Sequence, residues 1–342
     1  MEELLPIRTP RLTVRMMTSD DAEVLAAYRN EPEVAKHQLW DLPYPVEEAR
    51  RMLAGQRADE QLAPGGKYQL AIEVDGVLVG DVFTDVGETG GTAEIGYTLA
   101  TAHQGHGYAT EAAGAVVAAL YDRIGCVRVY GELDPENVAS QRVLERIGLI
   151  YEGVTKQSFL WRGEWTDNMS YAATRADYDE WRNRPSGPPA VVDLVELDWR
   201  NEAAYRRLRT HHSEERFVDP TWLSIVGAHF PEEINGAPVV PWMRGVGADA
   251  EPVGFLMIAE ATEHHPEPYV WRLLIDRLHQ RRGIARRAIG LLVEQLRRDG
   301  HTTLVTSWGE GPGSPRPFYE RLGFVPTGEI VDGETVARLS LG

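Results

Sequence analysis

The sequence has little of what marks secreted, membrane-spanning or nucleic-acid-binding proteins. Its 342 residues include one cysteine, Cys126, which cannot form an internal disulfide; we expect a buried core thiol and a reducing, cytoplasmic location. No apolar run approaches the roughly 20 residues that span a bilayer, and the N-terminal MEELLPIRTP lacks the pattern of a signal peptide. The formal net charge of −17 disfavours nucleic-acid and anionic-membrane partners and favours cationic ligands such as amines.

The chain contains an internal repeat. HQGHGYATEA begins at His103 and HQRRGIARRA begins at His279, each between a predicted strand and a predicted helix. Between the two copies, the proline-rich segment RNRPSGPPAVVD cannot continue a helix or a central strand. We therefore expect one domain over residues 1–183, a linker over 184–192 and a second domain over 193–342.

Hydrophobic periodicity predicts a similar order of elements in both halves, including a hairpin at Asp75-Gly76. In the first half we expect strands at 11–17, 68–74, 77–85, 93–100 and 127–134, helices at 21–30, 45–56, 109–125, 137–148 and 175–184, and a late hairpin over 150–174. In the second half we expect strands at 190–197, 238–247, 251–261, 268–276 and 302–309, helices at 205–217, 220–230, 284–300 and 314–323, and a terminal hairpin over 329–341. This order predicts an α/β (α+β) fold, present twice, with helices on a mixed, largely antiparallel sheet.

The repeated loop is suited to an anion. The first-turn N–H groups of a helix have no intrahelical partner and carry partial positive charge, so phosphate is the usual ligand. Small residues would let a phosphate approach the backbone: Gly105 and Gly107 in the first copy, Gly283 and Ala285 in the second. The second copy adds Arg281, Arg282, Arg286 and Arg287, whereas the first has only His103 and His106. A tight structural turn is the alternative; a P-loop would need Gly-Lys-Ser or Gly-Lys-Thr, and a dinucleotide fold would need a third glycine at Thr110.

Both loops, QGHGYA at 104–109 and QRRGIA at 280–285, fit the Q/R-x-x-G-x-G/A pattern of the GNAT N-acetyltransferases. The first half resembles the subgroup that acetylates ribosomal-protein N-termini and aminoglycosides, through EIGYTLATAHQGHGYATEA and ELDPENVASQRVLERIGL. The second half resembles general amine and polyamine acetyltransferases, through WRLLIDRLHQRRGIARRAIGLLVEQL and PFYERLGF. The resemblance covers nearly the whole chain and implies a tandem GNAT protein that uses acetyl-CoA, without a metal.

The resemblance also implies which residues hold acetyl-CoA. The loop would cradle the pyrophosphate, the strand before it would grip the pantetheine arm, and a strand N–H would polarise the thioester. These positions are Thr98, Leu99, Ala100, Gln104, Gly105, His106, Gly107, Tyr108, Ala109, Thr110 and Asn137 in the first half, and Leu274, Ile275, Asp276, Gln280, Arg281, Arg282, Gly283, Ile284, Ala285 and Arg286 in the second.

Acetyl transfer to an amine also needs a base for the amine and an acid for the leaving thiolate. Tyr319 matches the family's acid in the second half; the first half has no tyrosine there, and Ser140 is its candidate. Glu94 and Glu260 are the candidate bases, with an exposed strand end as the alternative interpretation of each. Weaker candidates are Glu132 and Asp134.

Two further residue groups allow more than one interpretation. His211-His212 and His264-His265 lack metal-ligand spacing, so we expect them on loops or helix faces. The tryptophans Trp40, Trp161 and Trp165 could line an amine pocket through cation–π contacts, or could simply pack in the core.

The sequence leaves three functions open. The first is acetylation of a small cationic amine, such as a polyamine, an aminoglycoside-like antibiotic or an amino-sugar, with one half dominant and the second half slightly favoured. The second is acetylation of protein N-termini, and the third is a non-catalytic CoA-binding scaffold. No nucleic-acid or membrane partner is expected, and the chain could be a monomer or a homodimer.

Overall fold

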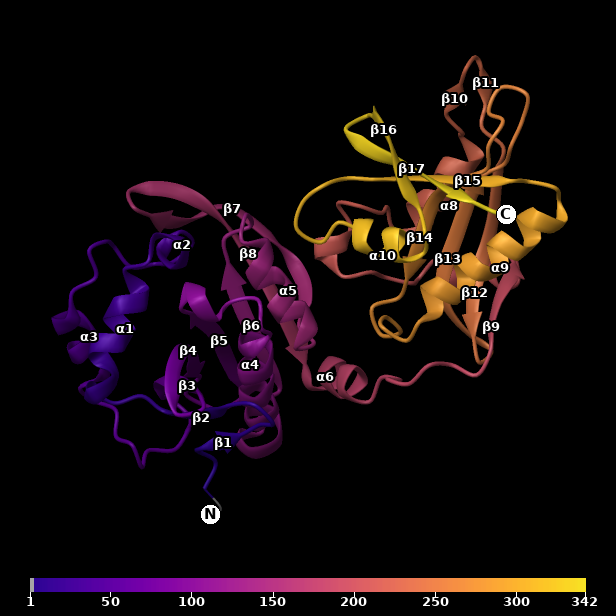
Figure 1. Cartoon of the computed structure of the whole chain (residues 1–342). Coiled ribbons are helices and arrows are strands. Elements are labelled where there is room, and N and C mark those ends of the chain that lie inside the picture. Colours follow the sequence, from indigo (N-terminus) through magenta and orange to yellow (C-terminus); the bar gives the residue numbers. More distant parts are fainter. Residues whose placement is uncertain (1–2) are drawn as a thin grey trace. The chain divides into compact units, whose positions relative to one another are not determined.

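The computed structural model describes residues 3–342, and the chain divides into two compact units between Arg182 and Asn183. Each unit is built on one large sheet with helices packed against it (Figure 1). The elements of the first unit are β1 (Ile7–Arg8), β2 (Thr13–Met16), α1 (Ala22–Arg29), α2 (Pro32–Ala35), α3 (Val46–Leu53), β3 (Lys67–Val74), β4 (Val77–Val86), β5 (Thr92–Leu99), α4 (Tyr108–Ala119), β6 (Arg128–Leu133), α5 (Val138–Arg146), β7 (Ile150–Trp161), β8 (Glu164–Thr174) and α6 (Arg175–Arg182). Those of the second unit are β9 (Val192–Glu196), α7 (Glu202–Tyr205), α8 (Thr221–His229), β10 (Glu233–Ile234), β11 (Ala237–Pro238), β12 (Pro241–Ala248), β13 (Glu251–Ala259), β14 (Tyr269–Ile275), α9 (Ile284–Arg298), β15 (Thr303–Trp308), α10 (Arg316–Arg321), β16 (Val325–Val331) and β17 (Glu334–Ser340).

The two sheets share one plan. The first unit has eight strands in the order β1-β2-β3-β4-β5-β6-β8-β7, and the second has seven in the order β16-β17-β15-β14-β13-β12-β9. In each, a single neighbouring pair is parallel, β5 with β6 and β14 with β15, and the other pairs are antiparallel. The predicted mixed, largely antiparallel α/β fold is therefore confirmed in both halves.

Strand alternation divides the core of the first unit between the two faces of its sheet. Leu70 and Ile72 on β3 pack with α4, whereas Ala71 between them packs with α1 and α3. The helix α4 lies on one side of the sheet, and α1 and α3 lie on the other (Figure 1). The hairpin between β3 and β4 turns at Asp75 and Gly76, whose positive φ values of 51° and 79° fit the Asp-Gly signal.

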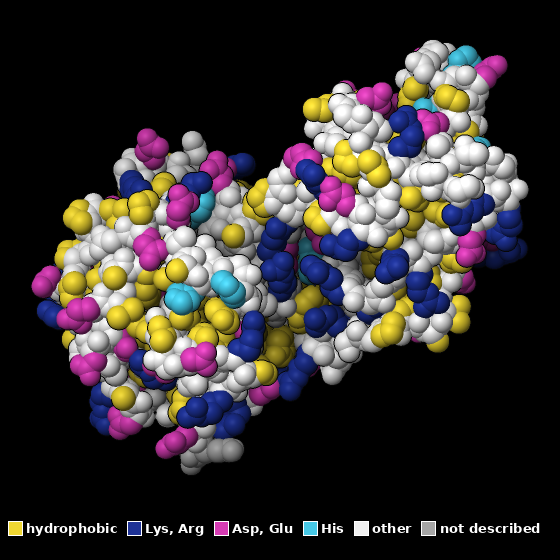
Figure 2. All heavy atoms as spheres, viewed as in Figure 1, with side chains coloured by type: hydrophobic (Ala, Val, Ile, Leu, Met, Phe, Trp, Pro, Cys, Tyr) yellow, Lys and Arg dark blue, Asp and Glu magenta, His cyan; other side chains and the backbone are white. Residues whose placement is uncertain are grey.

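The second unit repeats this arrangement. On β13, Leu256 packs in the cluster that contains the buried face of α9, whereas Phe255 packs with Ala228 of α8. Cys126 is buried in the first unit, as predicted for a core thiol. Charged side chains of both signs are interspersed over the visible face of each unit (Figure 2).

The helix predicted over 205–217 is wrong. Regular α-helix ends at Tyr205, and only a 3₁₀ turn, His212–Glu214, follows. His211 has an extended backbone, and the Glu214 side chain accepts the His211 N–H in a capping box. Such local side-chain hydrogen bonds compete with the backbone hydrogen bonds of a helix. The helix that hydrophobic periodicity predicted over 205–217 therefore does not form. The sequence interpretation also missed α2 and the short hairpin of β10 and β11.

Residues 3–342 contain neither a membrane-spanning helix nor a cluster of metal ligands. No helix there is long and apolar enough to cross a membrane. No group of three or more His, Cys, Asp or Glu side chains in the same residues could hold a metal ion. His212 instead bonds Glu215 at 2.8 Å, and His264 lies 3.4 Å from Glu263.

Candidate active site

The sheet of each unit opens at its parallel pair. β5 pairs with β6 only over Thr92–Glu94, and β14 pairs with β15 only over Tyr269–Val270. Beyond these short ladders the two strands of each pair separate. The C-terminal part of β5 and that of β14 therefore each have one edge without a strand partner. The opening lies directly before the repeated loop in both units.

Ladder alternation determines which amides face the opening. Ala100 donates its N–H to Val79 O at 3.0 Å, so the amide of Thr98 also faces β4, while the N–H groups of Leu99 and Tyr97 face the opening. In the second unit Asp276 donates to Val253 O at 2.8 Å. By the same alternation, the N–H groups of Ile275 and Leu273 face the opening, and those of Leu274 and Asp276 face β13.

The sequence analysis predicted cofactor contacts on the segment of each strand that borders the opening, and these contacts stay predictions. Of its six strand positions, only Leu99 and Ile275 turn their N–H groups to the opening. It missed Tyr97 and Leu273, which strand periodicity could have found once the first ladder bond was known.

The loop of the first unit leads straight into α4. Gly105 and Gly107 have φ values of 77° and 82°, which an L side chain rarely adopts. The first intrahelical bond is donated by Glu111 to Gly107 O, which leaves the amides of Tyr108, Ala109 and Thr110 without a helical partner. Gln104 fixes the start of the loop by donating to Leu99 O at 3.1 Å.

Arg11 supplies the cation that the first loop lacks in its own sequence. Its guanidinium donates to His106 O at 2.9 Å and to Glu111 Oε2 at 2.6 Å, and lies over the Tyr108 ring at 5.1 Å. Thr9 also donates to Glu111. Burial raises the pKa of Glu111, but the hydrogen bonds from Thr9 and Arg11 outweigh it and hold that pKa below its usual value.

The loop of the second unit has the same geometry with different side chains. Gly283 caps α9 with φ 77°, and Arg281, at the position equivalent to Gly105, also has a positive φ of 64°. Gln280 donates to Ile275 O at 3.2 Å, as Gln104 does to Leu99 O.

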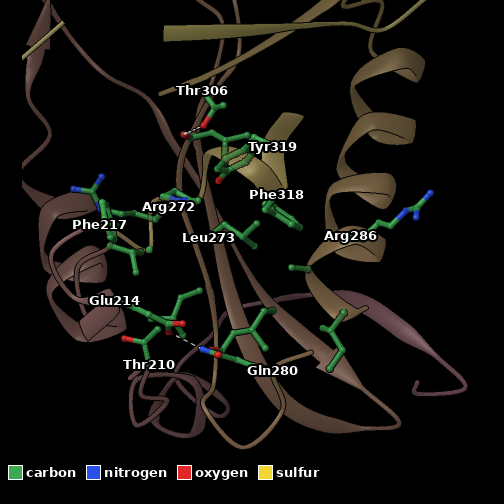
Figure 3. Close-up of a pocket in the computed structure, with 18 of the residues that line it drawn as sticks. Thr210, Glu214, Phe217, Arg272, Leu273, Gln280, Arg286, Thr306, Phe318 and Tyr319 are labelled. Atoms are coloured by element: carbon green, nitrogen blue, oxygen red, sulfur yellow. Dashed lines mark hydrogen bonds between the residues drawn. The ribbon is translucent and has the colours of Figure 1, made fainter. Parts of the chain in front are cut away.

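The four loop arginines do not all serve one surface. Arg282 donates to Gly187 O at 2.7 Å, and Arg287 donates to Pro189 O at 2.6 Å. These bonds tie both side chains to the segment that precedes β9. Arg281 and Arg286 line the cavity, although Figure 3 shows the Arg286 side chain extending outward from α9. Arg282 and Arg287 are thus bonded to the chain itself and do not line the cavity, and their pairing with phosphate stays a prediction.

A cavity of about 490 Å³ joins this loop to Tyr319. Figure 3 shows Leu273 between Gln280 at one end and Tyr319 at the other. Tyr319 stacks on Trp308 with ring centroids 5.9 Å apart, and burial raises its pKa to about 12, against the lowering effect of a hydrogen bond with Thr306. Gly283, Ile284 and Ala285 also line the cavity.

Glu260 lies elsewhere. It follows the end of β13, is exposed, and lines a different hollow from the one that contains Tyr319. The carboxylates that line the Tyr319 cavity are Glu214, which accepts from Gln280 at 2.7 Å, and Glu334. Glu334 accepts a hydrogen bond from Ser307, whose hydroxyl lies 2.5 Å from that of Tyr269.

The first unit has a larger cavity, of about 900 Å³, beside its opening. The three tryptophans Trp40, Trp161 and Trp165 all line it. Its acidic lining residues are Asp81, Glu94, Glu132, Asp134, Glu136 and Asp167, and its basic ones are Arg29 and His37. His37 Nδ1 lies 2.7 Å from Asp134. The lining is therefore aromatic and predominantly acidic.

Glu94 is the carboxylate whose electrostatics stand out in this cavity. It sits on the last residue pair of the short β5–β6 ladder, where the strands begin to separate. Burial raises the pKa of its carboxyl, and the nearby charges of Glu132 and Asp85 raise it further against the opposing effect of Lys67. A carboxyl that lines a cavity and has a raised pKa is a candidate general base.

Ser140 lies at the opening but is already bonded. Its hydroxyl donates to Tyr97 Oη at 2.9 Å, and the Tyr97 hydroxyl donates to Ser140 O at 2.8 Å. Asn137 caps α5 by accepting the Ser140 N–H at 3.0 Å. The structure thus brings Ser140, Tyr97 and Asn137 together on one side of the opening.

Comparisons with known proteins agree with this architecture. Residues 11–150 match a family model described as acetyltransferase (GNAT) domain, and residues 189–324 match one described as acetyltransferase (GNAT) family. The chain is 31% identical to the probable N-acetyltransferase YjcK of Bacillus subtilis (strain 168) over 141 residues, which are 40% of this chain and 77% of that protein. It is 29% identical to the uncharacterized N-acetyltransferase p20 of Bacillus licheniformis over 173 residues, 50% of this chain and 96% of that protein. A solved GNAT-family acetyltransferase from Bacillus anthracis aligns at 26% identity with a TM-score of 0.45, over 50% of this chain and 98% of that one.

Each family match spans an opened strand, the loop after it and the helix that the loop caps. Both halves therefore carry the strand, loop and helix whose sequences resemble the GNAT pattern, and the structure places these parts side by side. The chain belongs to the GNAT family of acetyltransferases, with one such domain in each half, and it is an acyltransferase.

Proposed function

We propose that the first unit transfers the acetyl group of acetyl-CoA to a primary amine held in its aromatic and acidic cavity. The observation that carries this proposal is the position of Glu94, a carboxyl with a raised pKa that lines the cavity at the point where β5 and β6 separate. Tryptophan faces and carboxylates together suit a cationic amine. The sequence slightly favoured the second half as the more active one; this cavity favours the first.

Different residues around the opening would bind acetyl-CoA, accept the proton of the amine and protonate the leaving thiolate. The loop and α4 would bind the pyrophosphate, and the outward amides of Leu99 and Tyr97 would bind the pantetheine arm and the thioester oxygen. Glu94 accepts a proton from the amine, whose nitrogen attacks the thioester carbon while the C–S bond breaks. The leaving thiolate takes a proton from the Ser140 hydroxyl, which gives up its bond to Tyr97 and regains a proton from solvent, while Glu94 releases the proton of the amine to solvent.

The direct test is to mix the full-length chain with acetyl-CoA and a panel of primary amines. Release of the CoA thiol should depend on the amine, and mass spectrometry should find the N-acetyl product. Binding of acetyl-CoA without any product would instead support a non-catalytic CoA-binding protein. Faster reaction with peptide N-termini than with every small amine would favour a protein acetyltransferase.

In the second unit, we infer a second acetyl-CoA site with Tyr319 as the acid. In a chain whose first unit is silenced by Glu94→Gln, Tyr319→Phe should lower the remaining amine acetylation by about 10²-fold or more, because the thiolate would leave without a proton. Thiol release under saturating acetyl-CoA measures this. Tyr205→Phe, at a tyrosine buried against Gly245 away from the cavity, is the matched control. An equal effect of the two variants would assign Tyr319 to packing alone.

A substitution of Arg11 tests the binding of acetyl-CoA to the first unit without an acceptor amine. Arg11→Met should weaken acetyl-CoA binding to the first unit about tenfold, because it removes a cation from the loop and leaves the Glu111 carboxylate facing the phosphates. Calorimetry on the single variant and on Arg11→Met/Glu111→Gln separates the two causes. The double variant should bind more tightly than the single one; equal affinities would show that Glu111 does not act on the ligand.

A further inference from the structure

One cation in the first unit's cavity has no anionic partner. Arg29, at the end of α1, lines the cavity and is only 7% exposed. Its guanidinium carbon lies 4.4 Å from the Trp40 ring centroid and 5.0 Å from that of Tyr44, and Nη1 donates to Tyr44 Oη at 3.0 Å. Its Nε is buried and has no hydrogen-bond partner. Among residues 3–342, no carboxylate forms an ion pair with this side chain.

Asp81 is the carboxyl that attracts Arg29, but its bonds go elsewhere. The Tyr28 hydroxyl donates to one of its oxygens and Gln69 Nε2 donates to the other. Burial raises the pKa of Asp81, which weakens it further as a counter-charge. A buried guanidinium is stable when paired, so an unpaired one that lines a cavity is suited to an incoming anion.

The carboxyl that attracts Arg29 and the proton-accepting Glu94 lie on the neighbouring strands β4 and β5. Asp81 pairs with Thr98 on β5, and Glu94 lies four residues before Thr98. Because a strand rises about 3.3 Å per residue, the backbones of these two positions are roughly 13 Å apart. Side chains that reach into the cavity from each end would leave room for a molecule with a short chain between its two charged groups.

We propose that Arg29 is an anion subsite, and that the acceptor is an amine carrying a carboxylate or phosphate on the same molecule. This inference rests on the proposed amine acetylation in the first unit. Arg29, whose guanidinium lies against the Trp40 and Tyr44 rings, pairs with the anionic group, while the amine lies toward Glu94. The acceptor is therefore zwitterionic and is distinguished from a polyamine, which carries cations at both ends.

The test compares amines that differ only in the anion. Butylamine, hexylamine and octylamine are set against 4-aminobutanoate, 6-aminohexanoate and 8-aminooctanoate, and 6-aminohexyl phosphate separates a phosphate from a carboxylate ligand. For at least one chain length, the wild type should acetylate the anionic amine with a kcat/KM about 10- to 100-fold above that of the plain amine, as expected for a charge-assisted hydrogen bond. Arg29→Met should bring this ratio close to one.

Arg51→Met removes the same charge from an exposed position on α3 and should leave the ratio unchanged. Arg29→Lys, which keeps the charge, covers the case in which Arg29→Met fails to fold, and should retain part of the preference. If the wild type acetylates plain and anionic amines equally at every length, the subsite is wrong while amine acetylation stands. If it acetylates neither series, the proposed function fails, and the subsite fails with it.

Discussion

Glu94→Gln will lower kcat for amine acetylation by the first unit by about 10²–10⁴-fold, the usual range for loss of a general base. The measurement uses the chain in which Tyr319→Phe silences the second unit, so that residual turnover does not hide the loss. Glutamine keeps the size and hydrogen-bonding capacity of the side chain but cannot accept the proton from the amine. The affinity for acetyl-CoA, measured by calorimetry, should change little because Glu94 lies away from the loop.

The pH dependence gives an independent check on Glu94. Its pKa is raised, and only the ionised carboxylate accepts a proton, so kcat/KM should fall as the pH drops through that raised pKa. Glu132→Gln removes one of the charges that raise it, and should move the acid limb of the profile to lower pH. Glu136→Gln, which removes another lining carboxylate, is the control. An acid limb that survives in Glu94→Gln would assign the base to another group.

The sequence predicted those parts of the site that depend on neighbouring residues. Gln104, the glycines after it and the start of α4 lie within one short segment, and so do their equivalents around Gln280. Their geometry is set by local backbone conformation and by helix-end amides, both of which can be inferred from residue type and order. For the same reason the two loops, which differ in charge, have similar structures.

What the sequence could not predict depends on contacts between distant segments. Arg11 reaches Glu111 across 100 residues, so the sequence near the first loop contains no sign of this cation. The bonds of Arg282 and Arg287 run nearly 100 residues back, to Gly187 and Pro189, and no local pattern predicts them. Glu260 has the right residue type at a strand end, but the strand carries it to a different hollow from Tyr319. Arg29 had no sequence signal, because only the fold places it beside Trp40.

An aspartate at Gly107 will weaken acetyl-CoA binding to the first unit by about 100-fold or more. Two unit charges about 5 Å apart repel by roughly 3 kcal/mol at an effective dielectric constant of 20, and the new carboxylate would lie at the helix end where the pyrophosphate should bind. Gly107 has a positive φ, which aspartate and asparagine tolerate better than other residues, and the nearest atom to an added Cβ is Arg11 Nη2 at 3.4 Å. The aspartate could also draw that guanidinium away from the ligand, which acts in the same direction.

Gly107→Asn separates charge from shape, since asparagine has the size and backbone preference of aspartate without its charge. The same pair at Gly283, where an added Cβ would meet nothing within 4 Å, tests the second loop independently. Calorimetric titration of acetyl-CoA into the four variants should show one site lost in each aspartate variant and two sites, somewhat weakened, in each asparagine variant. Equal losses for aspartate and asparagine would mean that the loop excludes side chains of any charge. No loss of affinity with either aspartate would place the phosphates elsewhere and overturn the anion site at the start of both helices.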